Sequence, residues 1–284
     1  QCNARGIMQP NDDNFNGERQ DLGSSNLATR SVRPVLATIL LIAFAELLMF
    51  SGMRREAIIL HTFVLIAVSI STVSQKDKYV AWALQALMLL PLLRLINFSM
   101  PVFSDMVLYR YFYIYIPLFI PIFLIIRHQS FSPVQLGLSF KKFVLYLPLS
   151  FVIGLLIAEA EFFIVPVVPL VPNMSFYNMV DIFLIMVFCV GLVEELVFRS
   201  LIQTRLEGLF GTTVGLIATS LLFGLMGSAY GTVSGVLFAS LVGLILGYMF
   251  IKTRSLPFVA LTHGLVNVFL FSLIPLLGPG IGIL

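Results

Sequence analysis

Residues 178–198, with the sequence NMVDIFLIMVFCVGLVEELVF, hold an unbroken run of uncharged and mostly apolar residues between Asp181 and Glu194. A helix that crosses a lipid bilayer needs about 20 predominantly apolar residues. Ionisable side chains inside such a helix are costly, and they usually face the interior of a helix bundle. The stretch therefore predicts a membrane-spanning helix, and the carboxylates near its end are candidate functional groups.

The rest of the chain has the same apolar character. Apolar residues make up 59% of the 284 residues and charged residues 11%, whereas about a quarter of a soluble domain is charged. This composition excludes a disordered chain, a secreted disulfide scaffold and an ordinary cytosolic enzyme, and the long apolar runs differ from the alternating pattern of a transmembrane barrel. We expect an all-α polytopic transmembrane helical bundle with about eight to nine spans. The runs that predict these spans lie at residues 35–52, 57–74, 79–97, 111–126, 143–165, 178–198, 212–229, 232–251 and 256–276.

The first 34 residues differ from all that follow. They are rich in Asn, Asp, Gln, Gly and Ser, so residues 1–34 predict a polar, disordered tail. The two cysteines, Cys2 and Cys189, are far apart and form no motif typical of a disulfide framework or a metal site.

The placement of Lys and Arg predicts the orientation in the membrane. With nine spans, the tail and the links after spans 2, 4, 6 and 8 carry 13 of the 17 basic residues. The excess of positive charge places that side, and the amino terminus with it, in the cytoplasm. We expect Arg94, near the end of its span, to extend toward the interface. No cluster of basic residues suggests a nucleic-acid partner; the lipid bilayer is the expected partner.

The densest group of ionisable residues is Gly191-Leu-Val-Glu194-Glu195-Leu-Val-Phe-Arg199. Glu195 and Arg199 are four residues apart, so one helical face carries both and they can pair. Glu194 is rotated by about 100° from Glu195, and it has no partner on its own helix. Such a carboxylate can act as a general base or acid. The alternative is a structural ion pair beside a second glutamate at the interface.

A second group lies in the last span, where His263 and Asn267 are also four residues apart. Both can donate hydrogen bonds into one cavity, or Asn267 can hold one tautomer of His263. The alternative is that both residues bond to neighbouring helices as packing contacts. A third segment, Phe223-Gly-Leu-Met-Gly227, is rich in small residues and by itself indicates close helix packing.

Other ionisable residues in the predicted spans are fewer and more scattered. Glu159 and Glu161 are two residues apart and cannot share one helical face, so we expect only one of them to line a cavity. The remaining ones are Glu46, His61 and Asp181.

Together the three segments resemble the CPBP family of intramembrane endopeptidases, also called the Abi or type II CAAX prenyl protease family. That family shows Glu-Glu-x-x-x-Arg, then Phe-x-x-x-His, then His-x-x-x-Asn/Asp, each on a different membrane helix. Glu194-Glu195-Leu-Val-Phe-Arg199 matches the first motif and His263-Gly-Leu-Val-Asn267 the third. The resemblance covers roughly residues 130–270, so it divides the chain into amino-terminal transmembrane helices, residues 35–127, and a protease-like core, residues 128–284.

The middle motif departs from the family pattern, because Gly227 stands where the family has a histidine. The resemblance implies that Glu194 is the general base and that position 227 holds its partner. It implies that His263 and Asn267 stabilise the oxyanion. It implies that the residues supporting the site are Glu195, Arg199 and Phe223. The chain is therefore expected to be an impaired protease.

The resemblance also implies the substrate and the place of action. The expected substrate is a membrane-embedded or lipidated peptide or protein, such as a prenylated CAAX-type protein, cut on the cytoplasmic side of a prokaryotic cell membrane. No cofactor is expected, because only Glu194 and His263 remain as ligands and catalytic zinc needs three. Two alternatives stay open: a membrane partner of the immunity type that binds peptides without cutting them, and a proton-coupled transporter. The transporter is disfavoured because no internal repeat is visible.

Overall fold

A computed structural model describes residues 31–99, 107–165, 167–227 and 231–278. The segment from Val32 to Leu284 forms one compact unit. All regular secondary structure in the described residues is helical, as the apolar runs predict, so the all-α bundle is confirmed. Residues 1–30 of the expected tail, Cys2 among them, lie outside the described residues, and the first helix begins at Arg33.

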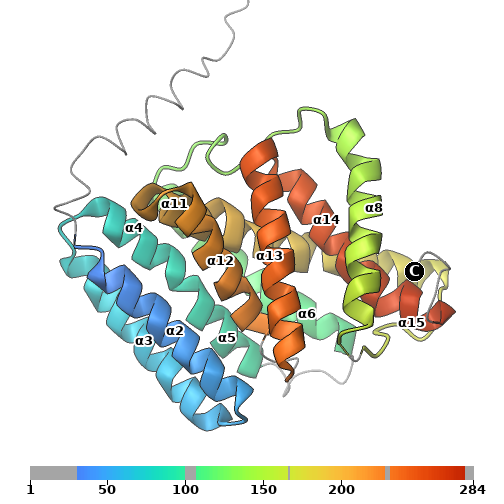
Figure 1. The fold of residues 1–284 in the computed structure, drawn as a ribbon, viewed down its shortest axis with the longest axis horizontal. Coiled ribbons are helices and arrows are strands. Elements are labelled where there is room, and N and C mark those ends of the chain that lie inside the picture. Colours follow the sequence, from blue (N-terminus) through green and yellow to red (C-terminus); the bar gives the residue numbers. More distant parts are fainter. Residues whose placement is uncertain (1–30, 100–106, 166, 228–230, 279–284) are drawn as a thin grey trace, which may run out of the picture. The chain divides into compact units, whose positions relative to one another are not determined.

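Four helices form the amino-terminal part of the bundle. Helices α2 (Arg33–Phe50) and α3 (Arg54–Ser74) run side by side (Figure 1) and are joined by a turn in which Gly52 has a φ of 80°. Glycine suits this turn because it adopts positive φ without a steric cost. Helix α4 (Lys78–Leu87) starts at Asp77, whose carboxylate accepts a hydrogen bond from the Tyr79 backbone N–H, and α5 (Leu89–Ser99) follows at once.

The next helical stretch corresponds to the short predicted run 111–126, and it is longer than predicted. It comprises α6 (Val107–Tyr115), the 3₁₀ turn η3 (Ile116–Leu118) and α7 (Phe119–His128). Pro117 lies in the 3₁₀ turn, where its missing N–H would interrupt an α-helix. The helix includes Tyr109 and Arg110 because polar residues at the end of a membrane helix can reach the interface.

Helix α8 (Phe143–Phe162) precedes a continuous helical stretch that carries the Glu-Glu motif. This stretch comprises α9 (Phe176–Leu184), η4 (Ile185–Gly191), α10 (Leu192–Glu195), η5 (Leu196–Gln203) and α11 (Thr204–Phe210). Both η4 and η5 are π-helical. π-Helical turns inside α-helices are frequent at functional sites.

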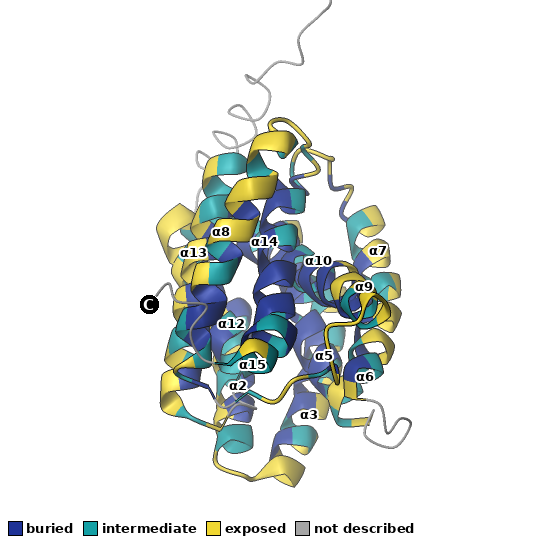
Figure 2. Ribbon diagram, turned by 90° about the vertical axis from the view of Figure 1, so that its right-hand side faces the viewer, coloured by how far each residue is buried: buried dark blue, intermediate teal, exposed yellow. Residues whose placement is uncertain are grey.

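The carboxyl-terminal helices complete the bundle. They are α12 (Thr212–Met226), α13 (Val233–Thr253), α14 (Leu256–Val268), the π-helical η7 (Phe269–Leu273) and α15 (Ile274–Leu277). Helix α14 lies in the interior: it is dark blue along most of its length in Figure 2, and α8 and η4 pack against it. Gly191 allows the close approach of α14, because a Cβ there would lie 2.7 Å from the Ala260 carbonyl oxygen.

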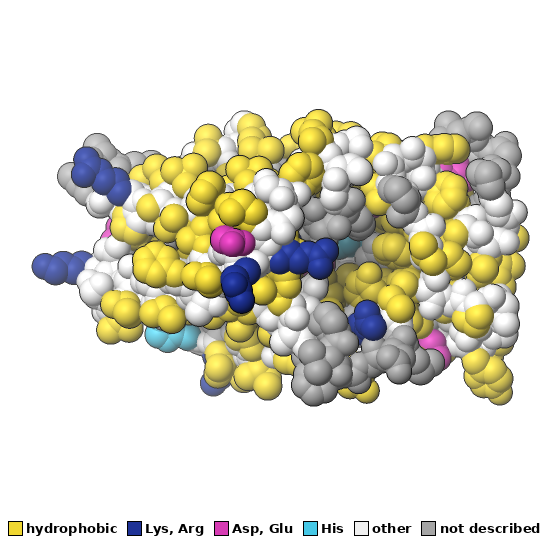
Figure 3. All heavy atoms as spheres, turned by 90° about the horizontal axis from the view of Figure 1, so that it is seen from below, with side chains coloured by type: hydrophobic (Ala, Val, Ile, Leu, Met, Phe, Trp, Pro, Cys, Tyr) yellow, Lys and Arg dark blue, Asp and Glu magenta, His cyan; other side chains and the backbone are white. Residues whose placement is uncertain are grey.

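Seven stretches in the described residues are long and apolar enough to cross a membrane. The run 178–198 and the described part of the run 212–229 are helical as predicted but are not among the seven; α12 has only 15 residues. Large apolar side chains cover the outer face of these helices, such as Leu40 at 68% and Val144 at 82% exposure. Figure 3, seen from below, shows hydrophobic side chains over much of that side and a group of basic and acidic side chains near its centre. The apolar outer face of the helices suits lipid contact.

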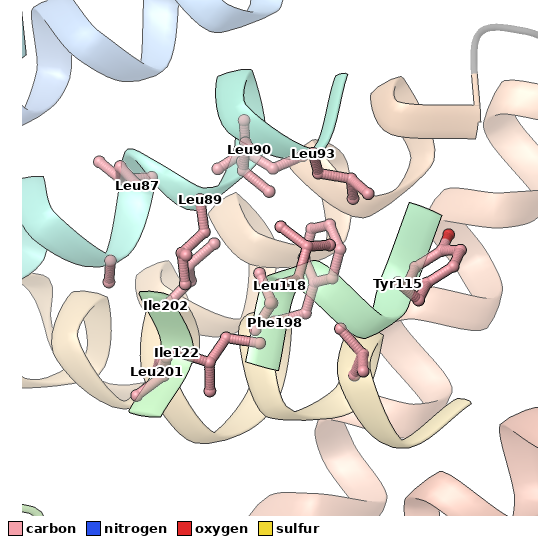
Figure 4. Packing of buried hydrophobic residues seen from close by; sticks show 14 of the residues in the cluster. Leu87, Leu89, Leu90, Leu93, Tyr115, Leu118, Ile122, Phe198, Leu201 and Ile202 are labelled. Carbon is pink, nitrogen blue, oxygen red and sulfur yellow. The ribbon is translucent and has the colours of Figure 1, made fainter. Parts of the chain in front are cut away.

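The two halves of the chain share one core. Leu87, Leu90 and Leu93 from α4 and α5 pack with Leu118 and Ile122 against η5 (Figure 4). The η5 residues in this cluster are Phe198, Leu201 and Ile202. The amino-terminal helices therefore form one wall around the Glu-Glu motif. The division at residue 128 stays a prediction.

Candidate active site

A cavity of about 210 Å³ lies inside the bundle and brings together all the predicted catalytic positions. Its lining includes Glu194, Gly227, His263 and Asn267, which come from α10, the end of α12 and α14. The amino-terminal helices supply another wall through residues of α5 and α6. These lining residues are Leu93, Arg94, Asn97, Tyr111 and Tyr115.

Glu195 lies at the centre of a buried charged group beside the cavity. Its Oε2 lies 3.0 Å from Arg199 Nε, so the pair predicted from their spacing forms, with both side chains fully buried. Its Oε1 lies 2.8 Å from His263 Nδ1. The bond to Nδ1 orients the imidazole ring and leaves Nε2 for other contacts. Glu195, and not Asn267, therefore holds the ring of His263.

Glu194 faces the same histidine from the other side. Its Oε1 accepts a hydrogen bond from the Tyr115 hydroxyl. Its Oε2 lies 3.8 Å from His263 Nε2. This separation is too long for a direct hydrogen bond, and a water that bonds to both atoms has to lie to one side of the line between them, on the cavity side. One carboxylate oxygen of Glu194 is thus bonded to Tyr115, and the other lies near His263 Nε2 at the cavity.

The charges of this group nearly cancel. Two carboxylates and one guanidinium leave one negative charge in excess, and one further proton, on His263 or on Glu194, makes the group neutral. A buried cluster of this kind is most stable when its total charge is close to zero. A carboxylate and an imidazole that share one proton are the kind of pair that acid–base catalysis requires.

Aromatic rings pack against the charged group. Phe223 lies edge-on to His263, with the ring centroids 5.6 Å apart, and the Arg199 guanidinium carbon is 4.7 Å from the centroid of Phe223. Phe198 packs edge-on against Phe223. Phe223 thus contacts both His263 and Arg199, and a cation above its ring face is attracted electrostatically. Its supporting role stays a prediction.

The end of α12 brings Gly227 to the cavity wall. Gly227 follows the last residue of the helix and has a φ of −78°, which any L-amino acid can adopt. It contributes no side chain to the cavity. Residues 228–230, which include the end of the predicted run 212–229, lie outside the described residues.

A second buried polar group lies between the amino-terminal helices. Arg94 Nε and Nη2 donate to the two carboxylate oxygens of Glu46 at 2.9 and 2.6 Å, and Nη2 also donates to the Met226 carbonyl oxygen at 2.7 Å. His61 Nε2 lies 3.1 Å from Glu46. Arg94 is only 4% exposed, so the expectation that it extends toward the interface is wrong. The reason is the buried partner on α2, which a single-helix pattern does not reveal.

Glu161 is the member of its pair that lines the cavity. Glu159 is also buried, and neither of its carboxylate oxygens has a hydrogen-bond partner. Glu161 thus lines the cavity and Glu159 does not.

The part of the chain that the structure describes contains no group of three or more His, Cys, Asp or Glu side chains that could hold a metal ion. The absence of a metal stays a prediction.

Sequence reasoning missed the residues that α5 and α6 contribute. Arg94 gave a usable signal, because an arginine inside an apolar span usually has a buried partner. Tyr115 gave none, since tyrosines are common in membrane helices and its partner lies 79 residues further along the chain. Long-range contacts of this kind need the three-dimensional structure.

Comparison with known proteins supports the motif interpretation. Residues 177–269, about a third of the chain, match the family model of type II CAAX prenyl endopeptidase Rce1-like proteins. The match contains all three motif segments. Comparison with curated proteins and with solved structures found no match. Residues 177–269 are therefore similar to type II CAAX prenyl endopeptidase Rce1-like proteins, and this match is consistent with the CPBP family that the motifs resemble.

Proposed function

We propose that this chain is an intramembrane endopeptidase in which Glu194 activates water against a peptide bond of a membrane-associated, prenylated CAAX-type substrate. One observation carries the proposal: Glu194 Oε2 and His263 Nε2 face each other across 3.8 Å at a cavity, and each residue is held at its other end. The Rce1-like domain supports the family of the activity.

The reaction begins with a water in the cavity that bonds to both Glu194 Oε2 and His263 Nε2 from one side. Glu194 accepts a proton from this water, and the hydroxide attacks the carbonyl carbon of the scissile bond. The carbonyl oxygen takes the negative charge, and the Nε2–H of protonated His263 and the Asn267 amide donate hydrogen bonds to it. The C–N bond then breaks, and Glu194 delivers its proton to the leaving amine.

Glu195 and Arg199 support these steps without touching the substrate. Glu195 orients His263 through Nδ1, and Arg199 balances the charge of Glu195. Both are fully buried, so they keep this geometry while the cavity fills and empties.

The missing side chain at Gly227 lowers the rate in this proposal. A positioned acid–base partner contributes roughly 10²–10⁴-fold to catalysis. The chain is therefore proposed to be a slow protease with an intact fold. It would cut on the cytoplasmic side of the membrane, which the distribution of Lys and Arg predicts.

The second candidate is a membrane partner that binds peptides without cutting them, and Gly227 is the observation that favours it. In this case the cavity holds a peptide segment, but no side chain at position 227 completes the water site. Binding would then survive loss of Glu194.

The test compares purified forms in detergent on a fluorogenic farnesylated peptide: this chain, Gly227→His, and Gly227→His combined with Glu194→Gln. We expect the Gly227→His form to cut faster than the parent and the Glu194→Gln form not to cut. Gly227→His with Glu159→Gln is the matched control, because Glu159 is a buried carboxyl outside the cavity. Equal cleavage by the Gly227→His form with and without Glu194→Gln refutes the proposal, and peptide binding without cleavage in every form favours the second candidate.

A further inference from the structure

Tyr115 contacts the candidate base from outside the Rce1-like domain. It is the last residue of α6, is 6% exposed and lines the cavity, and its hydroxyl donates to Glu194 Oε1. The domain match begins at residue 177. The contact therefore joins the amino-terminal helices to the catalytic carboxylate.

The hydrogen bond has a geometric consequence for Glu194. The terminal torsion of a glutamate is broad, so an unheld carboxylate can rotate freely. A hydroxyl bonded to Oε1 fixes this rotation and leaves Oε2 facing His263 Nε2. Glu194 then presents one oxygen, in one direction, to the water that it has to deprotonate.

Tyr115 is itself rigidly supported. Its ring belongs to the core cluster with Leu93, Leu118 and Phe198, as Figure 4 shows. Helix α6 packs against η4, and a second bond ties it to the same long helix: the Tyr109 hydroxyl donates to Asp181 at 2.9 Å. Core packing around its ring can therefore hold the Tyr115 hydroxyl within the narrow geometry that catalysis needs, without the Tyr109 bond, which lies outside the cavity.

Gly227 lines the cavity without a side chain. Within the described part of the chain, Glu194 has a hydrogen bond from Tyr115 and an ion-pair contact with His263. We infer that Tyr115 is a positioning residue for Glu194 and that its hydroxyl takes over the orientation of the base at a site where position 227 cannot supply it. This inference rests on the proposed function and names a residue that the domain match does not include.

The kinetic test is a double-mutant cycle in the full chain with four forms: the parent, Tyr115→Phe, Gly227→His and the double variant. Loss of the hydroxyl in the parent is expected to lower kcat roughly ten- to a hundredfold with KM nearly unchanged, the size expected for a hydrogen bond to a charged group. In the Gly227→His background the same loss is expected to cost less than about threefold, because the histidine then orients Glu194. Tyr109→Phe is the matched control and leaves kcat within about twofold, since it removes a tyrosine–carboxylate bond from the same helix outside the cavity.

Two kinetic results would overturn the inference. An equal loss from Tyr115→Phe in both backgrounds shows that the hydroxyl does not substitute for a side chain at position 227. An equal loss in Tyr109→Phe shows that the effect comes from the stability of α6.

A spectroscopic readout separates this inference from the proposed function. Difference infrared spectra assign the carboxyl bands of Glu194 as those absent in Glu194→Gln. We expect these bands to shift in Tyr115→Phe and not in Tyr109→Phe; unshifted bands overturn the inference whether or not any form cuts. If no form cuts, the proposed function fails and so does the kinetic role of Tyr115, while the infrared comparison still decides whether Tyr115 holds Glu194.

Discussion

Removing the charge of Arg94 should destabilise the whole bundle. In Arg94→Met, Glu46 keeps a carboxylate that is fully buried, and it loses the two hydrogen bonds of 2.9 and 2.6 Å that compensate its burial. His61 Nε2 stays 3.1 Å from Glu46 and does not replace these two hydrogen bonds. Breaking a buried ion pair by removing one partner costs about 3–5 kcal/mol, because the other charge is left uncompensated.

This cost can be measured by thermal unfolding in detergent. For a chain of this size about 1 kcal/mol lowers Tm by about 2–4 °C, so Arg94→Met should unfold roughly 6–20 °C below the parent. The fluorescence of Trp82, the single tryptophan, reports the transition. It lies on α4, beside the helix of Arg94.

The double variant Glu46→Gln/Arg94→Met separates charge from packing. In this variant neither position 46 nor position 94 carries a charge, and the glutamine at position 46 can still bond to His61. We therefore expect the double variant to regain most of the stability that Arg94→Met loses, because neutral replacements of buried ion pairs often do so. The reasoning is refuted if Arg94→Met unfolds within about 2 °C of the parent. It is also refuted if the double variant loses the sum of the two single losses, since the two residues would then act independently.

Three further predictions follow from single contacts. Gly191→Ala should lower Tm, because its Cβ would lie 2.7 Å from a backbone oxygen of α14 and overpacking costs about 1–3 kcal/mol; Gly208→Ala, with nothing within 4 Å, should raise Tm slightly in the same assay. Asp77→Ala removes the cap of α4 and should cost about 1 kcal/mol in chemical denaturation. Glu195→Gln should abolish cleavage in the Gly227→His form while farnesylated-peptide binding persists, because His263 loses the anion that orients it and stabilises its charge; unchanged kcat contradicts this role.

The helical fold was predictable because it depends on composition and run length, which are local properties. Every predicted apolar run is helical over most of its described residues, including 178–198, where Glu194 and Glu195 lie near one end as expected. The Glu195–Arg199 pair was predictable for the same reason, since four residues on one helix lie on one face. The helix ends were predicted less well: the run 111–126 became a stretch from Val107 to His128, because aromatic and basic residues continue a membrane helix into the interface.

The contacts between helices were not predictable from one sequence. Periodicity places a residue on a face of its helix and does not identify the helix that it meets. Glu46 therefore gave no sign of Arg94, which lies 48 residues away, and His263 gave no sign that Glu195 would hold its Nδ1. The spacing separated Glu194 from the Glu195–Arg199 pair on its own helix. The residues that Glu194 contacts, Tyr115 on α6 and His263 on α14, come from two other helices and were not predicted.

These contacts also bear on how large the functional unit is. The Rce1-like domain contains Glu194, His263 and Asn267, but the cavity that holds them is closed on one side by α5 and α6. Without these helices Glu194 would lose its bond to Tyr115, and the end of α12 would lose the bond from Arg94 to Met226. Buried polar groups deprived of their partners cost stability as well as geometry. The amino-terminal helices are thus part of the site, and a chain cut at residue 128 should neither fold as stably nor hold its base in place.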